Sequence, residues 1–517
     1  MGVKRGRVRT GILAALSVVL AVFNPAMSTA RNRAVDLSSQ TDAIVTGSTV
    51  ASPGDGPNGP HDWGDVNGDG EPDVIVAKRA GTYLNRENTG IVYVLFGPFQ
   101  EGELNVENPS TEGFRIGGAS SDDYSGTSLA GVGDVNGDGL DDVLIGAPHA
   151  DNGRGDLTGV AYVVFGKPTE EDVDLMHFEL GIQGEQGFRI DGAEFRDMAG
   201  TNVDGIGDIN GDDLDDMVVQ SIFAGSTYVV FGKADTEPVD LREFNQGDQG
   251  PQGFRIKHPG APSSGPEYHG VEGVGDVNGD DVPDMYIDAC IRQTDSGHCT
   301  EMRAWIVFGK TDSKLIRVWH LRNNKGFSIH GGMNGSALSL RPGRAGDVNR
   351  DGLSDVAVLR WPRGVNKAFV VFGKRNTRAV DLDDIGRYGY KIKARPRLHD
   401  GEKGPLDVYE LWESAAAGDV NKDGVPDMLL SAPVATPRQR KFAGSVFVVY
   451  GQKHRRKPIK LEDLGARGYR IDGSQKKESI SREIAGAPSL NPGSRPDFMI
   501  WGGVDRSLVY LSWGRRL

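Results

Sequence analysis

Hydrophobic residues in this chain are grouped in short runs that are separated by turn-forming residues. The runs are rich in Val, Ile, Tyr and Phe, and Gly, Asp, Asn and Pro bound them. Such runs are typical of β-strands joined by tight turns, whereas an amphipathic helix shows apolar residues with a period of about 3.6. No helical period of useful length occurs between the runs. The pattern therefore predicts an all-β protein.

The apolar runs belong to a unit that repeats along the chain. Each unit contains Gly-Asp-Val-Asn-Gly-Asp-Gly or a close variant, then an Asp and an apolar run, and successive copies are 69, 74, 68, 71 and 72 residues apart. A second phrase ends in an aromatic residue and Gly, as at Phe96 and Gly97, and a third reads Gly-Phe-Arg-Ile, as at Gly113. A regular period of this length indicates a repeat architecture. The first Asp of each copy is Asp65, Asp134, Asp208, Asp276, Asp347 or Asp419.

A seventh, degenerate copy completes the series. Ser489 stands where the next first Asp is expected, and Asn491, Gly493 and Asp497 occupy the following positions. About four strands in roughly 70 residues match one blade of a propeller, whereas the repeats of solenoids are usually much shorter. We therefore predict a single seven-bladed β-propeller domain over residues 31–517, with a bare turn in place of the seventh loop.

The two ends of the repeat region predict how the ring closes. The segment from Thr41 to Gly47 aligns with the Gly-Phe-Arg-Ile phrase, and the Asp36-Leu37 pair before it matches Asp381-Leu382. The last repeat stops just after its aromatic-Gly phrase, so its outer strand is missing. An N-terminal strand that completes this last blade would remove the open edges of the ring.

The first thirty residues have the three parts of a secretory signal peptide. An apolar run from Ile12 to Phe23 is too short to cross a bilayer comfortably. Ser28 and Ala30 supply small residues before a cleavage point. We predict that residues 1–30 are removed and that the mature chain is secreted to the extracellular space without a membrane span; an uncleaved anchor is the alternative. The basic residues before the apolar run are Lys4, Arg5, Arg7 and Arg9.

The repeated acidic phrase predicts a calcium-binding loop. Its pattern is Asp-x-Asn-x-Asp-Gly-x-x-Asp, and oxygen donors at positions 1, 3, 5 and 9 suit Ca²⁺, a hard cation that takes six to eight oxygen ligands. Position 7 adds a backbone carbonyl, and position 6 needs a left-handed backbone, for which Gly is the usual residue. Asp213 and Asp281 replace that Gly in two copies. The loops are not EF-hands, because position 12 is aliphatic and flanking helices are not expected.

Six loops retain every ligand position, which predicts about six calcium ions. The expected side-chain ligands are Asp65, Asn67, Asp69 and Asp73; Asp134, Asn136, Asp138 and Asp142; Asp208, Asn210, Asp212 and Asp216; Asp276, Asn278, Asp280 and Asp284; Asp347, Asn349, Asp351 and Asp355; and Asp419, Asn421, Asp423 and Asp427. The expected backbone carbonyls belong to Glu71, Leu140, Leu214, Val282, Leu353 and Val425.

These phrases resemble the FG-GAP repeats of integrin α-subunit propellers. The clearest copy runs from Gly133 to Pro148 and keeps the Gly-Ala-Pro that characterises the family. Integrins carry calcium loops in only some blades, and this chain shows no leg domains or transmembrane helix, so it looks more like a stand-alone secreted FG-GAP protein. The resemblance implies a role in extracellular interaction or adhesion. It does not identify the partner, which could be a protein or a glycan.

Catalytic signatures are missing from the sequence. No His-Glu-x-x-His and no Gly-x-Ser-x-Gly occurs, so we predict a binding module rather than an enzyme. The alternatives are a propeller that binds or degrades polysaccharide in its central funnel, and a purely structural surface protein. FG-GAP-like repeats also occur in glycosylphosphatidylinositol-specific phospholipase D, but the catalytic domain of that enzyme is not expected here.

Charge and composition narrow the class of partner. The net charge of −14 disfavours nucleic acid. Acidic residues prevail before residue 310 and basic residues after it. This asymmetry reflects either the acidic metal ligands or a basic sector that binds an acidic partner.

Two further local features predict specific chemistry. Cys290 and Cys299 are the only cysteines, and export favours a disulfide between them across one hairpin. Arg154, Gly155 and Asp156 form an integrin-recognition tripeptide in the loop after the second strand of blade 2, and chance is the alternative explanation in a chain this rich in Gly, Asp and Arg.

Overall fold

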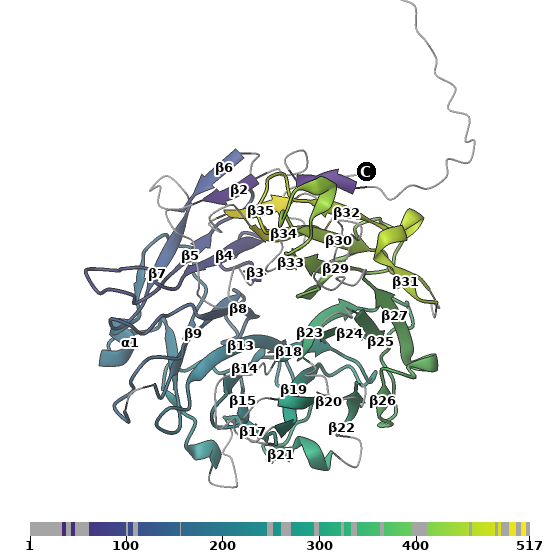
Figure 1. The fold of residues 1–517 in the computed structure, drawn as a ribbon. Coiled ribbons are helices and arrows are strands. Elements are labelled where there is room, and N and C mark those ends of the chain that lie inside the picture. The colour runs from purple at the N-terminus through teal and green to yellow at the C-terminus, as the bar shows by residue number, and fades with distance from the viewer. Residues whose placement is uncertain are drawn as a thin grey trace, which may run out of the picture.

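The structure is a computed structural model in which seven small β-sheets form a ring (Figure 1). It describes residues 34–37, 43–46, 62–99, 102–106, 112–155, 157–245, 252–259, 270–293, 299–321, 325–331, 339–361, 367–394, 411–453, 457–480, 484–487, 496–502 and 508–512.

Each sheet has five strands, ordered here from the centre of the ring outward. Blade 1 contains β3 (Asp62–Gly64), β4 (Asp73–Lys78), β5 (Ile91–Leu95), β7 (Gly113–Gly117) and β11 (Val173–Asp174). Blade 2 contains β8 (Ser128–Gly133), β9 (Asp142–Ala147), β10 (Val160–Val164), β12 (Gly187–Asp191) and β16 (Val239–Asp240). Blade 3 contains β13 (Ala199–Gly207), β14 (Asp216–Ser221), β15 (Ser226–Val230), β17 (Gly253–Lys257) and β21 (Ile316–Arg317). Blade 4 contains β18 (Val271–Gly275), β19 (Asp284–Gln293), β20 (Cys299–Val307), β22 (Gly326–His330) and β26 (Val380–Asp381).

The remaining three blades follow the same order. Blade 5 contains β23 (Ser339–Gly346), β24 (Asp355–Trp361), β25 (Lys367–Val371), β27 (Gly389–Lys393) and β31 (Ile459–Lys460). Blade 6 contains β28 (Ser414–Gly418), β29 (Asp427–Ala432), β30 (Ser445–Val449), β32 (Gly468–Asp472) and β1 (Ala34–Asp36). Blade 7 contains β33 (Ile484–Ala487), β34 (Asp497–Gly502), β35 (Leu508–Ser512), β2 (Ala43–Thr46) and β6 (Gly102–Asn105).

Helical structure is confined to short turns in the described part of the chain. These are α1 (Met176–Leu180) and the 3₁₀ turns η2 (Glu243–Asn245), η3 (Val318–His320), η4 (Gly386–Tyr388), η5 (Pro437–Gln439), η6 (Leu461–Asp463) and η7 (Gly465–Arg467). Among the described residues, no helix has the length and apolar character needed to cross a membrane.

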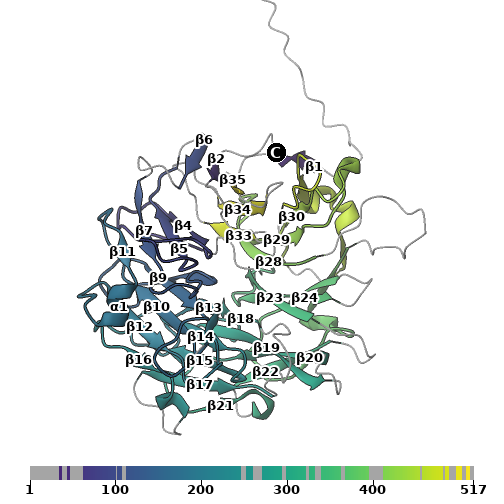
Figure 2. The ribbon, with the colours of Figure 1, turned by 60° about the vertical axis from the view of Figure 1, so that its left-hand side comes forward.

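The innermost strands contact one another in sequence around the centre, and β33 contacts β3 to close the ring (Figures 1 and 2). The all-β propeller predicted from the sequence is therefore confirmed. The prediction of four strands per blade was incomplete, because each sheet gains a short fifth strand from the next repeat. For example, Val173 and Asp174 of the second repeat pair in parallel with Ile116 and Gly117 of blade 1.

The predicted closure by an N-terminal strand is also confirmed. Strand β2 pairs antiparallel with β35, with Ala43 opposite Leu511, and so completes the last blade. Strand β1 adds to blade 6, where Ala34 lies opposite Arg470. Two blades thus contain strands from both the N-terminal and the C-terminal part of the chain, which joins the first and last repeats (Figure 1).

Apolar side chains from neighbouring sheets form the core between blades. Phe188 of blade 2 and Tyr228 of blade 3 belong to one such cluster. In blades 1 to 6, the aromatic residue of the aromatic-Gly phrase packs edge-on against the aromatic residue of the Gly-Phe-Arg-Ile phrase or its variant in the same blade. The pair Phe165 and Phe188 shows this at 6.0 Å between ring centroids. The two phrases recur together because their rings pack against each other.

A repeated lysine links the blades where the aromatic-Gly phrase is followed by Lys. The ammonium group of Lys374 lies 3.3 Å from the ring centroid of Phe327 in the preceding blade. It also donates hydrogen bonds to the carbonyls of Asn376 and Arg378. A cation over an aromatic face stabilises the contact between blades, and its two hydrogen bonds hold the ammonium group in place. Lys167, Lys233 and Lys310 lie over Phe114, Phe188 and Phe254 in the same way.

The described residues of blade 4 are consistent with the predicted disulfide between Cys290 and Cys299. Cys290 is disulfide-bonded, and Cys299 is the one other cysteine of the chain. The two residues stand on β19 and β20, which form an antiparallel hairpin.

Replacing both cysteines by Ser should lower the free energy of unfolding by about 2–3 kcal/mol, because the bond closes a loop of roughly ten residues in the unfolded chain. Urea denaturation of the wild type and the double variant measures the difference. Intact-mass analysis after alkylation without reductant provides the control. Two alkylated thiols in the unreduced wild type would contradict the disulfide.

Candidate metal-binding loops

All six predicted loops connect the innermost strand of a blade to the second strand. They follow β3, β8, β13, β18, β23 and β28, so the ring carries them at equivalent places in blades 1 to 6 (Figure 1). Every side chain that the sequence predicted as a ligand in these loops lies within the described residues.

The acid at position 9 is the most deeply buried of the predicted ligand side chains in each loop. In blade 2 the Oδ2 atom of Asp142 accepts a hydrogen bond from Val135 N at 2.9 Å, and Oδ1 accepts one from Gly166 N at 2.8 Å. Gly166 is the Gly of the aromatic-Gly phrase, so this carboxylate joins the loop to that phrase. The same bond to the phrase Gly occurs in all six blades, and these acids are 0% exposed: Asp73, Asp142, Asp216, Asp284, Asp355 and Asp427.

Burial dominates the electrostatics of the position 9 acids. Desolvation, together with the nearby carboxylates of Asp138 and Asp134, raises the pKa of Asp142 to about 8. Hydrogen bonds from backbone N–H groups oppose this shift only in part. The pKa of Asp73, Asp216, Asp284 and Asp427 is raised to about 7 for the same reason, and that of Asp355 is raised too. A bound cation would favour the ionised form of each acid.

The acids at positions 1 and 5 organise the turn. Asp134 Oδ2 accepts a hydrogen bond from the position 6 amide, Gly139 N, at 2.8 Å, and Asp138 Oδ1 accepts one from Leu140 N at 2.9 Å. Both bonds recur in all six loops. Position 6 is left-handed throughout, as predicted, with φ of +89° at Gly139 and +69° at Asp213.

The predicted ligands at positions 3 and 9 lie close together in the loops. The amide Nδ2 of Asn349 lies 3.0 Å from both carboxylate oxygens of Asp355, so positions 3 and 9 face each other. In blade 1 the Oδ1 atom of Asp65 is buried and has no hydrogen-bond partner in the described part of the chain. Within the described residues, no three His, Cys, Asp or Glu side chains stand close enough to hold a metal as they are. The residue types fit Ca²⁺, and binding would require the carboxylates to close around the ion.

The sequence did not predict that the loops of blades 1 and 2 also bond to the blade that follows each of them. In blade 1 the backbone N of Asp65 donates to Asp141 Oδ2 of blade 2 at 2.7 Å, and Asp141 N donates to Asp65 O at 3.1 Å. Asp215 of blade 3 makes the same pair of bonds to Asp134. Position 8 carries this contact, and its variation among Asp, Pro and Ser hid it in the sequence. A loop that tightens around an ion would therefore also fix the junction between two blades.

The degenerate seventh loop falls largely outside the described residues. Ser489, Asn491 and Gly493 lie there, so the predicted bare turn stays a prediction. Asp497 is described and is buried at the start of β34.

Comparisons with known proteins agree with these features. The family model of the FG-GAP repeat matches residues 62–95, 125–164 and 411–449. Integrin alpha-4 of Xenopus laevis is 28% identical over 169 residues, which are 32% of this chain and 14% of the integrin. The chain is an integrin-α-like FG-GAP repeat protein.

Other relatives show how widely such repeats occur. A mouse phosphatidylinositol-glycan-specific phospholipase D is 35% identical over 107 residues, which are 20% of this FG-GAP protein and 12% of the enzyme. A solved structure of BBS1N in complex with ARL6DN aligns over 93% of this chain and 98% of its own, with 9% identity and a TM-score of 0.44. The FG-GAP protein matches only about one seventh of the length of integrin alpha-4.

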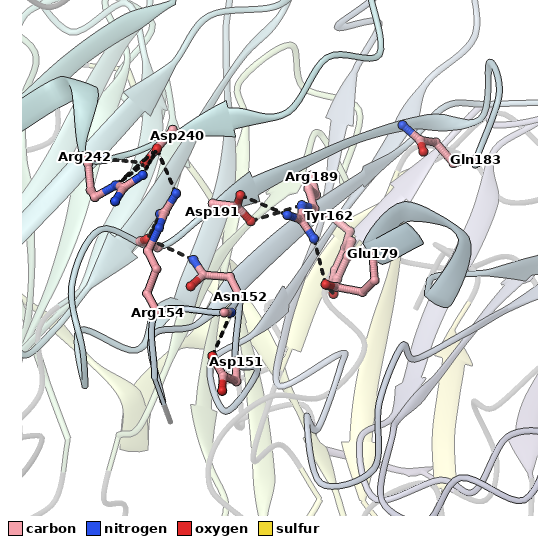
Figure 3. A network of polar contacts seen from close by, with 12 residues as sticks. Asp151, Asn152, Arg154, Tyr162, Glu179, Gln183, Arg189, Asp191, Asp240 and Arg242 are labelled. Carbon is pink, nitrogen blue, oxygen red and sulfur yellow. Dashed lines mark hydrogen bonds and ion pairs between the residues drawn. The ribbon is translucent and has the colours of Figure 1, made fainter. Parts of the chain in front are cut away.

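The Arg154-Gly155-Asp156 tripeptide does not present a free arginine (Figure 3). Arg154 Nη2 pairs with Asp240 Oδ2 at 2.8 Å, and Nη1 donates to Gly192 O at 2.6 Å. Arg242 also pairs with Asp240, and the side chain of Arg154 is only 20% exposed. Asp156 lies outside the described residues. The hydrogen bonds and the ion pair of Arg154 hold its side chain against blade 2. This favours chance as the explanation of the tripeptide.

Polar side chains on the inner strands of blades 3 to 5 are paired with one another. Arg344 Nη2 lies 3.1 Å from Asp204 Oδ2, and Nε donates to Gly273 O at 2.7 Å. Glu272 accepts a hydrogen bond from Arg344 N at 2.9 Å, and desolvation raises the pKa of Glu272 to about 8. One arginine of blade 5 thus reaches blades 3 and 4. This arrangement gives the inner wall a structural link between three blades.

Proposed function

We propose that this FG-GAP protein is a secreted, calcium-dependent interaction or adhesion module outside the cell. The observation that carries the proposal is the six-fold recurrence of one acidic loop, each built on a fully buried Asp and, in blades 1 to 3, bonded to the adjacent blade. The likeness to integrin α subunits supports an adhesion-type role.

Calcium would be held by the carboxylates of positions 1, 5 and 9, the Asn oxygen of position 3 and the carbonyl of position 7. A bound ion would supply positive charge that offsets the repulsion among three closely spaced carboxylates. The protein residues orient the turn through backbone hydrogen bonds and exclude water from position 9. Mg²⁺ should substitute poorly, because it demands tighter octahedral geometry and keeps its waters.

A pull-down from the native cell surface, with and without calcium, tests this function. We expect calcium-dependent capture of a defined protein or glycan component. Incubation of captured glycan with the protein, followed by product analysis, tests the alternative of a polysaccharide-degrading propeller. Release of shortened glycan would replace the module by an enzyme, and capture that ignores calcium would contradict the role of the loops.

The proposed export predicts the N-terminus of the mature chain. Residues 1–33 lie outside the described residues, so the predicted signal peptide rests on the sequence. Exported protein should begin near Arg31, because Ser28 and Ala30 fit a signal peptidase site. N-terminal sequencing of the protein recovered from the medium measures this. A mature form that retains Ile12 to Phe23 would contradict secretion as a soluble chain.

A further inference from the structure

Blade 5 carries a straight row of four cationic side chains. Arg360 lies opposite Lys367 in the pairing of β24 with β25, and Lys367 lies opposite Lys393 in the pairing of β25 with β27. Lys393 in turn lies opposite Lys460 of β31. Residues directly opposite each other in a sheet share one face, so all four side chains project from the same side. We call these four residues the blade-5 basic row.

The row runs radially from the second strand to the outer rim of the propeller (Figure 1). Neighbouring strands are about 4.8 Å apart, so the four cations span about 14 Å at a regular interval. Exposure increases outward: Arg360 and Lys367 are half-buried, whereas Lys393 and Lys460 are exposed. Lys391 stands two residues before Lys393 on the same face and adds a fifth cation beside the row.

The equivalent rows of the other blades do not have this character. Blade 2 has Ala147, Val160, Asp191 and Asp240 in these four places. Blade 3 has Ser221, Ser226, Lys257 and Arg317. Blade 6 has Ala432, Ser445, Asp472 and Asp36. The fold therefore does not require cations at these positions, and their presence in blade 5 needs a separate reason.

Like charges placed directly opposite one another destabilise a sheet. The pKa of Lys367 is lowered by burial first and then by Arg360 and Lys391. Asp383 compensates part of this charge, because it pairs with Arg360 at 2.5 Å and accepts a hydrogen bond from Lys391 Nζ through its carbonyl. Within the described residues, Lys367, Lys393 and Lys460 have no ion-pair partner. An anionic ligand would relieve this repulsion.

We propose that the blade-5 basic row binds a linear acidic polysaccharide, with the acidic groups of the ligand lying along the row. This inference rests on the proposed extracellular binding function and names a ligand class for it. The regular spacing of the cations matches a polymer that repeats its charge.

Other classes of partner fit the row less well. Protein partners are usually anchored by buried aromatic or aliphatic residues, and membrane-surface segments combine basic residues with apolar ones. Blade 5 contributes none of the large apolar side chains that are exposed among the described residues, which are Leu84, Leu180, Ile182, Phe195, Trp319 and Phe442. The net charge of −14 disfavours nucleic acid.

Binding of full-length protein to dextran sulfate, polygalacturonate and neutral dextran, at several salt concentrations and with calcium present, tests the proposal. The test variant is Lys393→Gln with Lys460→Gln. Its matched control is Lys257→Gln with Arg317→Gln, because these residues occupy the same two exposed positions in blade 3. Both variants remove two positive charges from the same strands of a blade.

We expect the wild type and the blade-3 control to bind an acidic polymer equally well and to ignore neutral dextran. The blade-5 variant should bind about 30-fold more weakly, since each cation near an anionic surface contributes roughly a fivefold change. Its logarithmic salt dependence should also fall by about two. Equal loss in both variants, or no loss in the blade-5 variant, would overturn the proposal.

Phosphatidylserine vesicles and single-stranded DNA serve as competing probes. If either depends on the row while neither acidic polysaccharide binds, the ligand class proposed here is wrong. The outcome is separable from the broader function. If capture from the cell surface fails while the row still binds acidic polymer, only the adhesion role is contradicted. If capture succeeds while the row does not bind acidic polymer, only the proposed ligand of the row is contradicted.

Discussion

Removing calcium should lower the melting temperature of the protein by roughly 4–11 °C. Extracellular calcium modules bind with dissociation constants of about 0.1–1 mM, so each site filled at about 2 mM calcium adds about 0.6–1.8 kcal/mol to the free energy of unfolding. Six such sites add about 4–11 kcal/mol in total. An unfolding entropy of about 2.1 cal/mol/K per residue makes each kcal/mol worth about 1 °C for a ring of this size that unfolds as one unit.

Thermal unfolding in calcium, in magnesium and in chelator measures this effect, and metal analysis of the purified protein supplies the stoichiometry. Magnesium should leave the melting temperature near the value in chelator. Re-addition of calcium after chelation is the control for irreversible damage. A melting temperature that chelation does not change, together with fewer than three calcium ions per chain at saturation, would contradict the six-site interpretation.

The repeat period was enough to predict the propeller because each blade must bury both faces against neighbours of the same kind. The N-terminal strand was predictable too, since the segment from Thr41 to Gly47 carries the phrase that the last repeat lacks, and β2 lies in the expected place. The fifth strand was not predictable. Val173 and Asp174 form a two-residue edge strand, which is too short for any period to show.

The candidate loops were predictable in their residues but not in their division of labour. The pattern treats Asp138 and Asp142 as equivalent oxygen donors. Among the described residues, Asp138 is exposed and bonds only within its own loop, whereas Asp142 is buried and accepts a hydrogen bond from the Gly166 amide of a distant phrase. The sequence also did not predict the bonds between Asp141 and Asp65 or the contact of Lys167 with the ring of Phe114. In both cases the partner lies in the preceding blade.

This division of labour predicts a large difference between two substitutions in one loop. Asp142→Ala should destabilise the protein by about 2–6 kcal/mol in chelator and by about 0.6–1.8 kcal/mol more in calcium, where it also loses the ion. It leaves the buried N–H groups of Val135 and Gly166 without acceptors, and each unsatisfied buried donor costs about 1–3 kcal/mol. Asp138→Ala removes an exposed donor, so it should cost about 0.6–1.8 kcal/mol in calcium and nearly nothing in chelator.

Urea midpoints of the wild type and both variants, each in calcium and in chelator, measure the two costs separately. Asp142→Asn is the conservative control. Its amide oxygen still accepts one hydrogen bond, while its NH2 group opposes the second N–H donor. Its free energy of unfolding in chelator should therefore lie between those of the wild type and Asp142→Ala. Metal analysis should show one ion fewer in both Ala variants.

If Asp142→Ala were harmless in chelator, the position 9 acid would act only as a metal ligand. If Asp138→Ala cost as much in chelator as in calcium, the loop would be a plain structural turn, because an exposed acid that holds an ion contributes only when the ion is bound.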